Sequence, residues 1–127
     1  QWGALDFAGG IVVHTTAGFP AEGSKLAAFY DKFKAATGAA PETVYVATGY
    51  EIPYILDAAV KAAGSVEGPA LRDALANLKD VEVLTGKVTY AGTNRMPVRD
   101  ITLVEIQDGK RSLVLTAMPD PADVPNP

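Results

Sequence analysis

The hydrophobic period of this chain changes near Asp80, and this change constrains the fold more than any other feature. Between Ser24 and Asp80, apolar residues recur every three or four positions, which is the period of an amphipathic helix. After Asp80, apolar and polar residues alternate, which is typical of half-buried strands. The sequence therefore predicts an α/β chain in which helices are followed by a small set of strands.

The first part predicts one strand and three helices. The β-branched run 11–16 predicts a short buried strand. Ser24 is a candidate N-cap for a helix that ends at Gly38, and residues 41–63 predict a longer helix. Pro69 suits the first turn of a third helix. The face that the first helix should bury carries Leu26, Phe29, Tyr30 and Phe33.

The second part predicts strands and turns. The alternation over residues 86–90 places Val88 with Tyr90 on one face and Lys87 with Thr89 on the other. Residues 91–95 predict a turn. The pair Asp108 and Gly109 is a hairpin signal between apolar runs at 101–106 and 112–115, so an antiparallel hairpin should end the folded part. Four prolines follow within residues 118–127 and predict an extended tail.

Composition excludes several classes of function. The net charge is −4 and the basic residues are scattered, whereas nucleic-acid binding needs a clustered basic face. The chain has no cysteine, so disulfides, thiolate metal sites and thiol nucleophiles are excluded. His14 is the single histidine and lies inside a β-branched run, where it is either a strand residue that makes one hydrogen bond or a residue beside a cleft at the end of the strand. We therefore expect no enzyme, no metal site and no cofactor, because a small α+β enzyme would need a nucleophile, base or metal constellation.

Six segments of the chain carry recognisable motifs: GIVVHTT (10–16), LAAFYDKF with TGAAP (26–41), GYE with LDAAVKAAGS (49–65), LRDAL (71–75), LTGKVTY (84–90) and VEIQDGK (104–110). In their order and spacing, these segments resemble the periplasmic solute-binding proteins of the branched-chain amino acid ABC transporter family. Two departures are Ile52-Pro53, where the family has good helix formers, and Asn94-Arg95, where it has a glycine-rich turn.

The resemblance implies two α/β lobes that are joined by three crossovers and close on a ligand. This chain would be the carboxy-terminal part of such a protein, and its start at Gln1, without an initiator methionine, fits a processed or partial chain. Residues 1–19 would end the second lobe and cross over. Residues 20–80 would add helices to the first lobe, residues 81–117 would supply strands and the return crossover, and residues 118–127 would form the tail.

The function that the resemblance implies is capture of a small molecule outside the cytoplasm. The ligand would be an amino acid or a small carboxylate such as an aromatic acid, and the partners would be a membrane ABC permease and the remainder of the two-lobed chain. The protein would be periplasmic or extracellular, either lipid-anchored or soluble. The alternative within the same fold is a ligand-sensing domain of a receptor or regulator.

Five residues are candidates for lining the ligand cleft. Thr15, Thr16, Gly18 and Phe19 follow the first strand, and ligands of open α/β sheets bind beyond the carboxyl ends of strands. The same residues also suit an ordinary loop with a glycine turn. Tyr50 can hydrogen-bond a ligand carboxylate, or it can pack in the core with its hydroxyl on a backbone group.

Overall fold

The computed structural model describes residues 11–93 and 96–123 as an α/β chain, with the helices before most of the strands as predicted. The helices are α1 (Lys25–Thr37), α2 (Val44–Ala63) and α3 (Gly68–Asn77), and Pro121–Asp123 form a short 3₁₀ helix. The strands are β1 (Ile11–Thr15), β2 (Val81–Val83), β3 (Gly86–Thr89), β4 (Val98–Arg99), β5 (Ile101–Gln107) and β6 (Lys110–Ala117).

Helix α1 begins and ends where the sequence predicts. The Ser24 Oγ accepts a hydrogen bond from the Ala27 amide at 3.1 Å, which satisfies one of the free amides at the start of the helix. Gly38 ends the helix in the left-handed conformation. Its apolar face forms a small core with the start of α2, made of Leu26, Phe29 and Ala47.

Helix α2 begins at Val44, so the predicted start at Pro41 is wrong by three residues. The backbone of Thr43 is still extended, and the helix starts only after it. The helix continues through Pro53, which cannot donate to the carbonyl of Gly49. Both residues are exposed, so water can take the place of the missing donor.

Helix α3 begins at Gly68 with Pro69 in its first turn, as predicted. It packs beside α2. Its apolar stripe is only half-buried, and no residue within the helix is fully buried. Leu78, which follows the helix, is buried.

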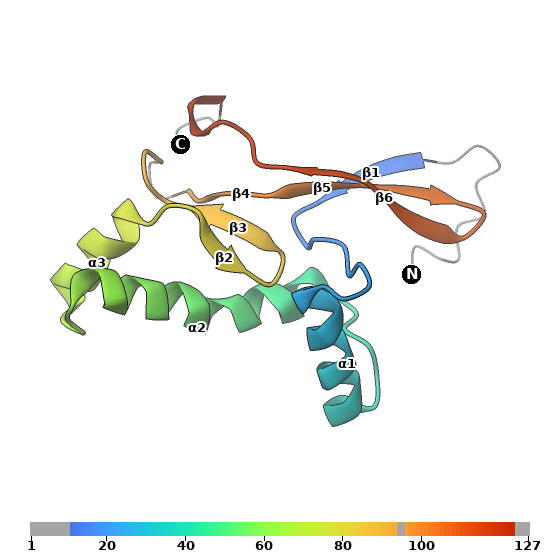
Figure 1. Cartoon of the computed structure of the whole chain (residues 1–127), viewed down its shortest axis with the longest axis horizontal. Helices are drawn as coiled ribbons and strands as arrows, with labels where there is room; N and C mark the ends of the chain where they lie inside the picture. Colours follow the sequence, from blue (N-terminus) through green and yellow to red (C-terminus); the bar gives the residue numbers. More distant parts are fainter. Residues whose placement is uncertain (1–10, 94–95, 124–127) are drawn as a thin grey trace.

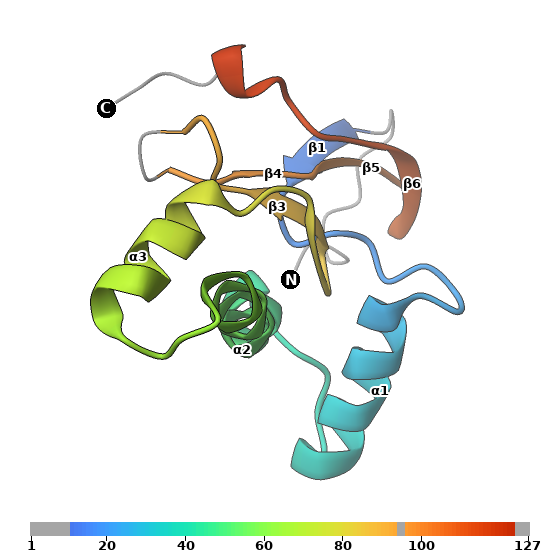
Figure 2. The ribbon, with the colours of Figure 1, turned by 60° about the vertical axis from the view of Figure 1, so that its left-hand side comes forward.

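The strands β2, β3 and β4 form a small antiparallel sheet in that order. Val83 of β2 pairs with Gly86 of β3, so Leu84 and Thr85 alone make the turn between them. This hairpin lies between α2 and the strands β4 and β5, as both views of the chain show (Figures 1 and 2).

The predicted alternation in β3 is only partly confirmed. Val88 is buried, as expected, but Thr89 is buried as well and does not face solvent with Lys87. The Thr89 Oγ1 accepts a hydrogen bond from the Asp80 amide at 2.9 Å. This bond supplies the partner that a buried hydroxyl needs, and the alternation rule cannot foresee it.

The strands β1, β5 and β6 form a second antiparallel sheet with β5 in the centre. The predicted hairpin of β5 and β6 is confirmed, and its turn residues Asp108 and Gly109 both have positive φ, of 50° and 70°. The strand predicted at residues 11–16 is confirmed as β1, but the prediction that it is buried is wrong. β1 is an edge strand paired with β5, so Val12 is 57% exposed and His14 is exposed.

The two sheets and the helices occupy different parts of the molecule. The three helices lie together on one side, and the ribbon of β1, β5 and β6 extends away from them (Figure 1). Helix α2 leaves large apolar side chains exposed, and β6 is exposed along its whole length. These exposed side chains include Tyr45, Tyr50, Ile52, Tyr54 and Leu56 of α2 and Leu113, Val114 and Leu115 of β6.

Some predictions fall outside the described residues: the glycine pair before the first strand, the departure at Asn94-Arg95 and the last residues of the proline-rich tail. The division into segments 1–19, 20–80, 81–117 and 118–127 stays a prediction. None of the helices within residues 11–93 and 96–123 has the length and apolar character that a membrane crossing requires.

Two glycine substitutions should have opposite effects on stability. Gly86 has φ +131°, and a Cβ there would lie 2.8 Å from the Asp100 Cβ, so Gly86→Ala should lower the free energy of unfolding by about 1–3 kcal/mol. Gly49 lies inside α2 with open space around it, so Gly49→Ala should raise that free energy by about 0.5–1 kcal/mol. Urea denaturation of both variants measures the changes, and equal effects would contradict this packing.

Candidate functional site

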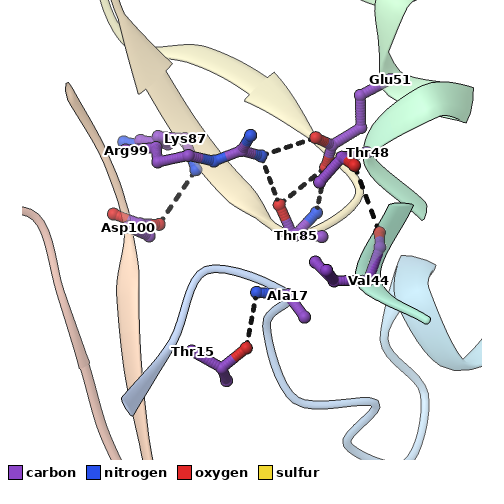
Figure 3. Close-up of polar contacts among 9 residues, drawn as sticks. All are labelled: Thr15, Ala17, Val44, Thr48, Glu51, Thr85, Lys87, Arg99 and Asp100. Carbon is purple, nitrogen blue, oxygen red and sulfur yellow. Dashed lines mark hydrogen bonds and ion pairs between the residues drawn. The ribbon is translucent and has the colours of Figure 1, made fainter. Parts of the chain in front are cut away.

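The loop after β1 is held by its own short hydrogen bonds. The Thr15 Oγ1 accepts from the Ala17 amide at 2.9 Å, which turns the chain directly after the strand (Figure 3). Thr16 is exposed, and Phe19 is half-buried with its carbonyl bonded to the Ala21 amide at 2.8 Å. The four predicted loop residues therefore lie within one five-residue segment, in which Thr16 is exposed.

Gly18 is the point at which this loop packs closely against the turn of the β2–β3 hairpin. Its φ is +68°, and a Cβ there would lie 3.2 Å from both the Cα and the carbonyl oxygen of Thr85 and 3.2 Å from the Leu26 side chain. A residue with a side chain would have to adopt an unfavourable backbone conformation and push these atoms apart. Glycine is thus required for the close approach of the loop to Thr85.

Two polar side chains, Glu51 and Arg99, bond to Thr85 and form a cluster with it (Figure 3). Glu51 of α2 is 1% exposed, and its Oε1 accepts from both the amide and the Oγ1 of Thr85 at 2.7 Å. Its Oε2 lies 2.6 Å from the Arg99 Nη2, and the same Nη2 donates to the Thr85 Oγ1 at 2.8 Å. Three segments far apart in the sequence therefore meet at one carboxylate.

The side chains of this cluster bond to one another. Both oxygens of Glu51 accept bonds, and the Thr85 hydroxyl donates to Glu51 while it accepts from Arg99. In the part of the chain that is described, no buried side-chain nitrogen or oxygen lacks a partner. The arrangement suits the holding of a structure rather than the transfer of a proton, which needs a group free to reach a substrate.

A second set of hydrogen bonds joins β3 to Asp100, the residue that directly precedes β5. The Lys87 amide donates to the Asp100 Oδ2 at 2.9 Å, and the Asp100 amide donates to the Lys87 carbonyl at 3.1 Å. Asp100 lies between Arg99, the end of β4, and Ile101, the start of β5. The two residues that directly precede β5 are therefore both fixed: Arg99 is bonded to Glu51, and Asp100 is bonded to Lys87.

Tyr50 lies beside the cluster in sequence but faces away from it. Its ring packs on Phe29 of α1, with centroids 4.7 Å apart, and lies 6.0 Å from the ring of Tyr54. It is 51% exposed, so it is neither buried in the core nor free of packing. Its role as a ligand contact stays a prediction, and so do those of Thr15, Thr16, Gly18 and Phe19.

The structure places one of the predicted residues, Gly18, beside the buried cluster. Gly18 lies against Thr85, and Glu51 of α2 is bonded to the amide of Thr85, so the loop and the first half of α2 converge on the hairpin turn. The ring contacts of Tyr50 are with the α1–α2 core instead. The site predicted from sequence is thus one ordered loop, with Tyr50 on an adjoining surface.

Sequence reasoning missed Glu51, Thr85 and Arg99. One signal was available, because Glu51 lies four residues after Ala47 and eight before Ala59, which places it in the buried stripe of α2. A carboxylate in such a stripe requires a buried partner. No local pattern identifies the partner, since Arg99 lies 48 residues away.

Two hollows lie outside this cluster. One, of about 680 Å³, is mostly apolar and lies between α3 and the turn after β3, beside Leu71, Leu75, Tyr90 and Thr93. The other, of about 300 Å³, lies between the start of α1 and the β2–β3 hairpin. Within the described residues, His, Asp and Glu side chains nowhere gather in a group of three that could hold a metal ion.

An exposed ion pair marks the rim of the smaller hollow. Lys25 donates to Glu82 at 2.9 Å, and this hydrogen bond, with the attraction between the charges, lowers the pKa of the Glu82 carboxyl below its ordinary value. A lowered carboxyl pKa stabilises the fold at neutral pH, and this contribution is lost as the pH falls through the lowered pKa.

Removal of the cation that is paired with the buried carboxylate should destabilise the fold far more than removal of a cation from an exposed pair. Arg99→Met leaves the carboxylate of Glu51 buried without its charge partner, so the free energy of unfolding should fall by about 3–5 kcal/mol. Lys61→Met is the matched control, because the Lys61–Asp57 pair on α2 is exposed and should contribute roughly 0.3–0.5 kcal/mol. Urea denaturation compares them, and similar losses would show that the buried pair has no special weight.

Comparison with known proteins gives the family. A family model described as periplasmic binding protein matches residues 3–111. The structure is similar to the leucine-binding protein LivK of Thermotoga maritima, with a TM-score of 0.61, 18% identity and coverage of 91% of this chain and 32% of that one. It is also similar to an ABC transporter solute-binding protein of R. palustris in complex with benzoate, with a TM-score of 0.61, 26% identity and coverage of 87% and 30%.

No curated protein matches the sequence. The chain spans about a third of the length of the two solved structures. The α/β order with its carboxy-terminal antiparallel hairpin is the fold of that part of them, and the resemblance stated from the sequence motifs is confirmed. Because the family model matches most of the chain, the chain belongs to the periplasmic binding protein family, and its fold is part of the two-lobed type I fold of the branched-chain amino acid group.

Proposed function

We propose that this chain is the carboxy-terminal part of an extracytoplasmic solute-binding protein that delivers a small molecule to an ABC transporter. The observation that carries the proposal is the antiparallel pairing of β1 with β5, from Ile11 opposite Ile106 to Thr15 opposite Thr102. The chain enters the helical block along one strand and leaves it along the neighbouring strand. Two adjacent strands of this kind suit a hinge between two lobes.

The exposed apolar surfaces support the proposal of a longer, two-lobed protein. Tyr45 on α2 is 79% exposed, and all eight residues of β6 are exposed, including three consecutive aliphatic side chains. Apolar surfaces of this extent mark sites of contact with other polypeptide. The remainder of the two lobes would cover them, with β6 in the second lobe and α2 in the first.

The ligand class that we propose is a small carboxylate, either an amino acid or an aromatic acid. Support comes from the two similar structures, one of a leucine-binding protein and one in complex with benzoate. The loop after β1 offers the hydroxyl of Thr16 and the backbone of Gly18, which suit a carboxylate, and the ring of Phe19 suits an apolar group. Tyr50 offers a half-exposed ring with a hydroxyl.

The partner that follows from this proposal is an ABC permease in the membrane, and the place of action is outside the cytoplasm. Closure of the two lobes would bury the ligand and present one closed surface to the permease. The protein would bind the ligand without changing it chemically. The mutual bonding of Glu51, Thr85 and Arg99 suits this role, because both oxygens of Glu51 already accept hydrogen bonds within the protein.

Ligand titration of the full-length protein tests the proposal. Thermal unfolding should be measured with a panel of branched-chain amino acids, benzoate and substituted benzoates. A ligand at about a hundred times its Kd should add about 2.7 kcal/mol of stability. A shift with one chemical class supports solute capture, whereas a folded protein that responds to no member of the panel would contradict the proposed ligand class.

A pair of tyrosine substitutions tests the proposed site. Tyr50→Ala should weaken binding of the ligand found in this way by about tenfold, or about 1.4 kcal/mol, because it removes both ring and hydroxyl. Tyr45→Ala on the same helix is the control and should leave the Kd unchanged, since its ring projects from a different face. Isothermal titration calorimetry measures both variants, and an unchanged Kd for Tyr50→Ala would remove Tyr50 from the site.

A further inference from the structure

The cluster of Glu51, Thr85 and Arg99 connects the two strands of the proposed hinge. On one side, Gly18 lies against Thr85 only three residues after the end of β1. On the other side, Arg99 is bonded to Glu51 two residues before Ile101, the start of β5. Arg99, just before β5, is therefore bonded directly to the buried carboxylate of Glu51 (Figure 3). The loop after β1 is linked to the same carboxylate only through Thr85, against which Gly18 lies.

Stability alone does not explain why this chain has a buried ion pair. A buried ion pair gains attraction but loses the hydration of both charges, and well-packed apolar residues often replace it at no cost in stability. A buried pair does require a particular geometry, because each partner left unmatched is strongly unfavourable. Glu51 and Arg99 thus restrict α2, the hairpin turn and β4 to one relative arrangement.

We propose that Glu51 and Arg99 are positioning residues for ligand binding, which hold the Thr85 turn as the support against which the loop of residues 15–19 is placed. The inference rests on the proposed function and deepens it, since that loop is the proposed wall of the ligand site. Neither side chain needs to touch the ligand. Their effect passes through the Thr85 turn, whose amide is bonded to Glu51 and whose backbone would lie 3.2 Å from a Cβ at Gly18.

The test uses a double variant that removes both charges together. Glu51→Leu with Arg99→Met leaves no unmatched charge in the core, so the full-length protein is expected to stay folded. The matched control is Asp57→Leu with Lys61→Met, which removes the exposed ion pair of the same helix. Urea denaturation of both double variants separates loss of global stability from loss of positioning.

The first readout is amide hydrogen exchange at Ala17, whose amide is bonded to the Thr15 Oγ1 within the loop, with the amides of the β5–β6 hairpin as the internal reference. Loss of positioning should speed exchange in the loop by about tenfold or more in the Glu51/Arg99 variant and leave the reference and the control variant unchanged. Unchanged loop exchange in a folded double variant would overturn the inference. This readout needs no ligand, so it decides the question even if the proposed function fails.

The second readout is the affinity for benzoate and leucine, measured by calorimetry. The Glu51/Arg99 variant should bind the probe that the unmodified protein binds about tenfold more weakly, while the Asp57/Lys61 variant binds as the unmodified protein does. A loosened loop with undiminished affinity would overturn the role in ligand binding. If the unmodified protein binds neither probe, the proposed ligand class is wrong, and loop exchange still determines whether the pair positions the loop.

Discussion

The burial of one carboxylate is the constraint on which the helical half of this structure depends. Glu51 is 1% exposed, and a charge in that position is tolerated only when every oxygen has a partner. The partners come from the turn of the β2–β3 hairpin and from the end of β4. Helix α2, the hairpin and the entry to β5 must therefore take one relative arrangement. Arg99, with a side chain that is 23% exposed, lies on the solvent side of this cluster.

This arrangement explains how a chain with a small apolar core can hold two strands side by side. The core of Leu26, Phe29 and Ala47 joins α1 to α2 but does not reach β5. The polar cluster and the reciprocal bonds of Lys87 with Asp100 make that connection instead. In the proposed two-lobed protein, this block would be the fixed end from which the β1–β5 pair leads to the other lobe.

Much of the fold could be predicted from local patterns, because helix caps, turns and periodicity act over a few residues. Ser24, Gly38, Pro69 and the Asp108-Gly109 turn all lie where the sequence places them. Errors arose where distant contacts decide the outcome: the edge position of β1 depends on its pairing with β5, and the burial of Thr89 depends on Asp80. The pairing of Glu51 with Arg99 could not be predicted, since nothing local relates the two positions.

The amide of Thr85 gives the most direct test of this account. Thr85 lies in a two-residue hairpin turn, where amides ordinarily exchange quickly with solvent, and its buried amide is bonded to Glu51 at 2.7 Å. Amide hydrogen exchange of the unmodified full-length protein, followed by NMR, should show Thr85 as strongly protected as the paired amides of β1 and β5. Exchange at the rate of an exposed turn would show that the buried carboxylate does not hold the hairpin, and would contradict the account.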